Sequence, residues 1–159
     1  MKAEESLKEE LQGYKAGITP TTKATLTWSR DLVFAGRTPQ GYDLDFDAEA
    51  QWGCKPTESL LLSLGGCMAI DIVSILKKMR MEISRFEMDL TGERNPEPPQ
   101  YFRSVEMVLR LAGKNLDARK IDRAISLSRQ TYCSVYNSLR PDLELKISYT
   151  LEEESGAPA

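Results

Sequence analysis

The 159-residue chain contains no histidine. This absence excludes catalytic arrangements in which an imidazole acts as the general base, such as Ser-His-Asp and Cys-His sites. It also excludes zinc and haem sites that use histidine ligands. A reactive thiol in this chain would therefore have to be activated by an arginine, a lysine or a helix N-terminus.

The chain also lacks an excess of positive charge. It has 21 Lys and Arg against 24 Asp and Glu, for a net charge of −3. Nucleic acids and anionic membranes both require a basic surface, so neither is an expected partner. The first twelve residues, MKAEESLKEELQ, are charged and contain no apolar segment of a secretory signal. We therefore expect a cytoplasmic protein.

Cysteine occurs at only three positions, Cys54, Cys67 and Cys133. Three cysteines in a cytoplasmic chain of this length do not suggest a disulfide scaffold. They also make a poor zinc site without histidine, because a structural site uses four N or S ligands at short spacings. The sequence therefore predicts neither a metal nor a cofactor. Taken singly, Cys67 and Cys133 are more readily explained as small buried side chains than as reactive thiols.

The hydrophobic pattern predicts one α+β domain over residues 21–152, preceded by a helical extension at 1–20 and followed by a disordered tail at 153–159. The strands come in hairpin groups instead of alternating with helices, which favours α+β over α/β. The expected elements are strands at 21–28, 32–34 and 42–46, a helix at 57–79, strands at 83–94 and 102–111, a helix at 117–133 with a further helical turn at 132–139, and a strand at 143–151.

The expected helix at 57–79 is apolar nearly all around, so we predict that it is buried on most sides. A membrane span is disfavoured, because Asp71 interrupts the apolar run and Gly65 and Gly66 lower helix propensity. The glycine pair indicates close approach by another element, such as a second helix. Asp71 lies one turn beyond Cys67. It could pair with a cation across a dimer, or raise the pKa of a nearby thiol.

Two segments around the cysteines resemble the motifs of the OsmC/Ohr superfamily. They are KPTESLLLSLGGCMAIDIVSIL at 55–76 and LSRQTYCSVYNSL at 127–139. The likeness extends over residues 22–152 and is greatest to the OsmC-like branch with GGC-x-A-x-D-[IV]-V-S-I-L. It implies an OsmC-like fold: an N-terminal antiparallel meander, a long buried cysteine helix, a β-hairpin, a second helix and a final strand. It also implies an intertwined homodimer with two active sites at the subunit interface.

The resemblance also assigns roles to residues. Cys67 would be the peroxidatic thiol and Cys133 the resolving thiol, with Glu58 orienting an arginine that stabilises the thiolate. Arg30 is the best match for that arginine, from the segment TLTWSRD, and Arg37 competes for the role. The chain departs from the family pattern at the helix start, which reads Lys-Pro-Thr-Glu where the family often has Asn-Pro-Glu. Without the family, Glu58 is equally well explained as a dipole-favoured helix residue, and Arg30 is better explained as a solvated turn residue.

The implied activity is the reduction of organic hydroperoxides to alcohols in oxidative-stress defence, through a Cys67 sulfenic acid and a Cys67–Cys133 disulfide. The partners would be a second copy of the chain, a small hydroperoxide and a dithiol reductant. One alternative is a redox-responsive or ligand-binding homodimer without turnover, and another is a structural dimer with inert thiols. Cys54 is either a loop thiol or a third redox thiol whose pKa Lys55 lowers.

Overall fold

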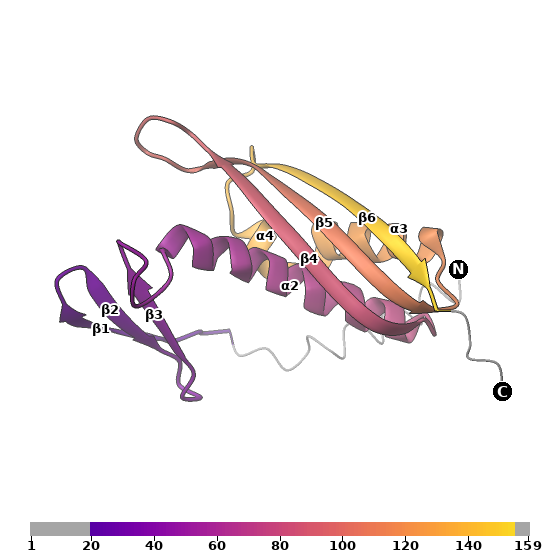
Figure 1. The fold of residues 1–159 in the computed structure, drawn as a ribbon, viewed down its shortest axis with the longest axis horizontal. Helices are drawn as coiled ribbons and strands as arrows, with labels where there is room; N and C mark the ends of the chain where they lie inside the picture. Colours follow the sequence, from indigo (N-terminus) through magenta and orange to yellow (C-terminus); the bar gives the residue numbers. More distant parts are fainter. Residues whose placement is uncertain (1–19, 155–159) are drawn as a thin grey trace. The chain divides into compact units, whose positions relative to one another are not determined.

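The computed structural model describes residues 20–154, which divide into two compact units with a boundary after Leu60. Helix α2 (Pro56–Lys78) begins in the first unit and continues into the second (Figure 1). The helical extension expected at 1–20 lies outside the described residues except for Pro20, and so does the expected tail beyond residue 154.

The first unit contains a three-stranded antiparallel sheet of β1 (Thr25–Arg30), β2 (Val33–Arg37) and β3 (Asp43–Asp47), in that order. This confirms the predicted meander. Asp31 makes the first turn with a φ of 42° and Gly41 the second with a φ of 89°, which is a conformation that glycine adopts without strain.

The sheet of the first unit leaves most of its large apolar side chains in solvent. Trp28 on β1 is 65% exposed, and Tyr42 before β3 is 76% exposed. A three-stranded sheet needs a covered apolar face to be stable. The exposed large apolar residues among the described strands and loops of this unit are Leu26, Trp28, Leu32, Tyr42, Leu44 and Trp52.

Helix α2 begins where its sequence favours a helix start. Pro56 occupies the first position, where its missing N–H costs nothing. The backbone N–H of Lys55 donates a hydrogen bond to Glu58 Oε2 at 2.9 Å, which is half of a capping box. Lys77 and Lys78 lie at the negative C-terminal end of the dipole. The predicted ends were therefore within one residue of those observed.

Helix α2 is buried on one face only. Its buried residues are Leu64, Gly65, Met68, Asp71, Ile72, Ile75 and Leu76. Leu62 is 63% exposed and Ile70 is 58% exposed. Burial on most sides was expected, but within residues 20–154 the helix is covered on one face only. The helix has the length and hydropathy of a membrane span, but core helices of globular proteins also meet that criterion, and this one buries an aspartate.

The second unit has a sheet of order β4-β5-β6, made of β4 (Glu82–Arg94), β5 (Phe102–Lys114) and β6 (Glu144–Glu153). The first two strands form the predicted hairpin, whereas β6 runs parallel to β5 after a helical crossover. Four side chains of β5 are buried as predicted, namely Val105, Met107, Leu109 and Leu111. Strand β6 includes Glu153, which was expected to begin the disordered tail.

Helices α2 and α3 (Ala118–Leu127) lie on the same face of this sheet (Figure 1). Lys120 Nζ donates to the carbonyl of Met79 at 3.0 Å, and Tyr149 Oη of β6 donates to Asp122 of α3 at 2.8 Å. The helices and the sheet therefore enclose the core of the second unit.

The second predicted helix does not run unbroken to Cys133. After α3, residues Ser128–Tyr132 form one π-helical turn, and α4 (Ser134–Asn137) follows. The Cys133 N–H bonds to the Ser128 carbonyl at 2.8 Å, five residues back, which widens the turn. Cys133 itself is extended, with φ −72° and ψ 98°. The wider turn and the extended residue end the helical run and direct the cysteine side chain inward.

The glycine pair of α2 has two different surroundings. A Cβ on Gly65 would lie 2.6 Å from Leu90 Cδ1, so β4 packs directly against the helix backbone there. The expected close approach is confirmed at this position, although the neighbour is a strand and not a second helix. A Cβ on Gly66 would meet nothing within 4 Å, so this position opens onto the exposed face of α2.

Candidate functional site

Cys67, Asp71 and Cys133 form one cluster in the second unit. Their sulfur atoms and a carboxylate oxygen all lie within 4.8 Å of one another. Cys67 and Asp71 share a face because they are one turn apart on α2. Cys133 reaches them from the end of the π-helical turn, and both thiols are unbridged. The structure therefore brings together two cysteines that are far apart in the sequence.

The three groups differ in access to solvent. Cys133 has no exposed surface and Asp71 is 3% exposed, whereas Cys67 is half-buried. Ser134 Oγ lies 3.9 Å from Cys67 Sγ, at the more open side of the cluster. A small solute therefore encounters Cys67 before the other two groups.

Burial raises the pKa of the Cys133 thiol to about 12, and the adjacent Cys67 and Asp71 act in the same direction. The backbone N–H of Tyr136 donates to Cys133 Sγ at 3.3 Å and partly opposes this increase. Cys133 is therefore a neutral thiol near pH 7 and a poor first nucleophile.

The carboxylate of Asp71 is held in place by Ser128, whose hydroxyl donates to Asp71 Oδ2 at 3.0 Å. The sequence left open whether Asp71 would approach a thiol, and it approaches both. Its charge raises the pKa of Cys133. The sequence did not predict the hydrogen bond from Ser128, although a serine in line with the apolar residues Ile121, Ala124 and Ile125 was a signal for it.

The environment of Cys133 predicts strong protection from alkylation. At pH 8, iodoacetamide is expected to modify Cys133 at least about 100-fold more slowly in the native chain than in the urea-unfolded chain, because thiolate falls tenfold for each unit by which the pKa rises. Quantifying the modified cysteine peptides by mass spectrometry gives the rate at each site. Equal rates for Cys133 in the native and unfolded chains would contradict its described burial.

Arg30 and Glu58 both lie in the first unit, whereas Cys67 lies in the second. The Arg30 guanidinium stacks over the Trp52 ring at 5.1 Å. The pKa of Asp47 is lowered chiefly by the hydrogen bond from the Glu49 N–H, and the charge of Arg30 adds a smaller effect in the same direction. Within residues 20–154, no ion pair joins Arg30 to Glu58, whose carboxylate instead caps α2. Their roles toward the thiol remain predictions.

The remaining two candidates of the first unit have local partners. Arg37 pairs with Asp43 across β2 and β3 at 3.5 Å. Cys54 is half-buried, and its Sγ donates to the carbonyl of Asp45 at 3.5 Å. This hydrogen bond anchors the Cys54 loop beside β3.

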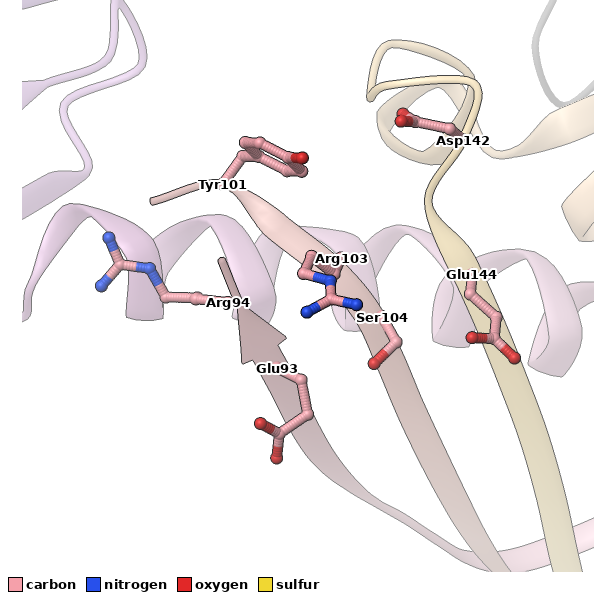
Figure 2. A pocket seen from close by; sticks show the side chains of 7 residues that line it. All are labelled: Glu93, Arg94, Tyr101, Arg103, Ser104, Asp142 and Glu144. Carbon is pink, nitrogen blue, oxygen red and sulfur yellow. The ribbon is translucent and has the colours of Figure 1, made fainter. Parts of the chain in front are cut away.

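A separate pocket of about 500 Å³ lies beside the loop end of the second sheet (Figure 2). It is lined by Glu93, Arg94, Tyr101, Arg103, Ser104, Asp142 and Glu144. Asp142 is paired with Arg140, and Arg94 donates to the Gln100 carbonyl at 2.7 Å. The lining carries both charge signs and contains no thiol, so the cysteine cluster is the stronger candidate for redox chemistry.

Residues 47–148 match the family described as OsmC-like protein. Protein YhfA of Escherichia coli (strain K12) is 34% identical over 128 residues, which cover 80% of this chain and 96% of that protein. A hypothetical protein from Aquifex aeolicus VF5 has a similar crystal structure, with a TM-score of 0.78 at 28% identity, covering 86% of this chain and 100% of that one. The organic hydroperoxide resistance protein OhrB of Bacillus subtilis shares the fold, with a TM-score of 0.56 at 19% identity, covering 82% of this chain and 98% of that one.

Proposed function

This chain belongs to the OsmC-like protein family, and on that premise we propose that it reduces organic hydroperoxides with Cys67 as the nucleophile and Cys133 as the resolving thiol. The observation that carries the proposal is the pair itself: a half-buried thiol with a fully buried thiol within 4.8 Å. The substrate class is supported by the shared fold of OhrB, which is named for organic hydroperoxide resistance.

The reaction has three steps. The Cys67 thiolate attacks the distal peroxide oxygen, the O–O bond breaks, and the alkoxide takes up a proton and leaves as an alcohol. Cys133 sulfur then attacks the Cys67 sulfenic acid; the S–O bond breaks and the hydroxyl leaves as water with the Cys133 proton. A dithiol reopens the disulfide through a mixed disulfide and is itself oxidised. The two sulfur atoms lie within 4.8 Å of each other, and side-chain rotation must bring them to a bond length of about 2 Å.

We further propose that Arg30 stabilises the Cys67 thiolate and the reacting peroxide, with Glu58 orienting the guanidinium. A guanidinium suits both tasks, because it is always charged and presents several N–H donors in one plane. The absence of histidine supports an arginine in this role. Arg37 is the alternative arginine.

A homodimer is the assembly we propose, with the active sites at its interface. Each unit has apolar surface that its own chain leaves exposed, including Trp28 on β1 and Leu62 and Ile70 on α2. A hollow of about 500 Å³ on the same helix is lined by Ala69, Ile70, Val73, Ser74 and Lys77. A second copy of this chain would cover both surfaces. A cytoplasmic location fits the proposal, since that compartment supplies dithiol reductants.

A turnover assay tests the activity against its alternative. Purified protein is mixed with excess cumene hydroperoxide and dihydrolipoamide, and the remaining peroxide is followed over time. We expect consumption of many equivalents of peroxide per protomer. Consumption that stops at one equivalent, with a stable disulfide, would instead identify the redox-responsive dimer without turnover. No consumption at all would refute both.

A further inference from the structure

The Cys67–Asp71–Cys133 cluster has the composition and spacing of a three-ligand zinc site. Thiolates bind Zn²⁺ at about 2.3 Å, so two of them on a tetrahedral ion are about 3.8 Å apart. All three ligand atoms here already lie within 4.8 Å of one another. The two sulfur atoms would have to approach by at most about 1 Å, which is within the reach of side-chain rotation, to complete the geometry. Three protein ligands with water in the fourth position is the arrangement of open zinc sites.

The surroundings of the cluster resemble those of metal ligands. Ser128 donates to Asp71 Oδ2 at 3.0 Å, and such hydrogen bonds orient ligating carboxylates. Asp71 and Cys133 are almost fully buried, whereas Cys67 is half-buried and leaves a side for water and for entry of the ion. The π-helical turn delivers Cys133 to this position. Spacing along the chain does not reveal which residues lie together in space, so the sequence alone did not predict this zinc site.

The charges of the cluster favour a divalent cation with affinity for sulfur. Cys67 Sγ, Cys133 Sγ and a carboxylate oxygen of Asp71 lie within 4.8 Å of one another, so three potential anionic ligands are gathered around one position. Thiols release their protons when they bind a divalent ion, so such an ion would be held by two thiolates and one carboxylate. Two sulfur ligands select Zn²⁺ over Mg²⁺ or Ca²⁺, which prefer all-oxygen sites.

We propose that the reduced protein binds one Zn²⁺ per protomer through Cys67 Sγ, Cys133 Sγ and the Asp71 carboxylate, and that disulfide formation abolishes this site. The second half rests on the proposed function, because it needs the same two sulfurs to become oxidised. Zinc thus masks the nucleophile and competes with the hydroperoxide.

The release step balances in atoms and charge. Zinc first dissociates and the freed thiols then react, so that in total the zinc-loaded protein, one hydroperoxide and two protons give the disulfide, free Zn²⁺, one alcohol and one water. The two thiolates are oxidised by two electrons, which reduce the O–O bond. Zinc itself undergoes no redox change.

The experiment titrates reduced full-length protein with Zn²⁺ in competition with a chromophoric chelator, and with Co²⁺ to detect thiolate-to-metal charge-transfer absorption. We expect one ion per protomer, bound at least about 100-fold more weakly by Cys67→Ser and Cys133→Ser and at least about tenfold more weakly by Asp71→Asn. The Asn variant retains an acceptor for Ser128 and removes only the charge. Oxidation of the loaded protein with diamide is expected to release the ion.

Two matched controls are available. Cys54→Ser removes the thiol of the first unit, and Asp122→Asn removes a hydrogen-bonded acid of α3 that lies outside the cluster. Both are expected to bind zinc as the wild type does. Equal zinc affinity in the wild type and Cys67→Ser, or in the wild type and Asp71→Asn, would overturn the proposed ligand set. Retention of zinc by the disulfide form would overturn the redox coupling.

The result of the zinc titration is independent of the result of the peroxide assay, because the titration contains no peroxide. A protein that binds zinc at the cluster but does not turn peroxide over supports the zinc site and refutes only the peroxidase. A protein that turns peroxide over but binds no zinc refutes only the zinc site.

Discussion

Replacing Cys67 with serine is expected to lower the rate of hydroperoxide consumption by at least about 1,000-fold, to the background of the assay without enzyme. A serine hydroxyl is not ionised near neutral pH and forms no sulfenic acid, so both the attack and the disulfide are lost. The rate is measured with cumene hydroperoxide and dihydrolipoamide, as for the wild type.

Replacing Cys133 instead should separate the two chemical steps. Cys133→Ser retains the nucleophile, so it is expected to consume one equivalent of peroxide rapidly and then to accumulate a sulfenic acid that dimedone traps at Cys67. Cys54→Ser serves as the matched control and should keep the wild-type rate, since Cys54 belongs to the first unit. A Cys67→Ser protein with wild-type activity, or an inactive Cys54→Ser protein, would contradict these roles.

Replacing Ile70 with lysine is expected to convert the proposed dimer into a monomer. Ile70 is 58% exposed on the face of α2 that the described elements leave uncovered, one helical turn from the open position at Gly66. If a second copy covers this face, the variant buries an unpaired charge at the interface, which costs several kcal/mol and weakens association at least about 100-fold. Sedimentation velocity across a micromolar concentration series measures the change in mass.

A charge introduced elsewhere controls for the substitution itself. Glu106 is exposed on β5, and Glu106→Lys is expected to remain dimeric. Thermal unfolding gives a second readout, because the midpoint of a dimer rises with protein concentration and that of a monomer does not. A monomeric wild type, or an Ile70→Lys variant of unchanged mass, would refute the proposed interface.

Much of the fold was predictable because its periodic signals are strong. The alternation along residues 102–111 placed Val105, Met107 and Leu109 in the core, where the structure has them. Proline at the start of α2 and lysines at its end marked both ends within one residue. These signals are local, since each depends on backbone geometry and on side chains a few residues apart.

Other features depend on contacts that a sequence pattern does not encode. The π-helical turn at Ser128–Tyr132 has no residue signature, so the second helix was predicted to run on to Cys133. The burial of α2 was overestimated because an apolar surface does not reveal whether its own chain or another covers it. The gathering of Cys67, Asp71 and Cys133 is likewise a tertiary contact.

Arg30 and Glu58 also show the difference between what the sequence suggests and which contacts the fold creates. Sequence resemblance proposed them as activators of the thiol, and the structure adds a local partner for each, the Trp52 ring and the N-terminus of α2. Such partners are compatible with catalysis, because a stacked guanidinium keeps its charge and its N–H donors.

The central claim is that Cys67 and Cys133 form a redox pair, and peptide mapping of the oxidised protein tests it most directly. Fully reduced protein, with its three thiols, is treated with one equivalent of cumene hydroperoxide per protomer and digested without reductant. We expect one free thiol per protomer, at Cys54, and a single cross-linked peptide that joins Cys67 to Cys133. Three remaining free thiols, or a cross-link that includes Cys54, would contradict the claim.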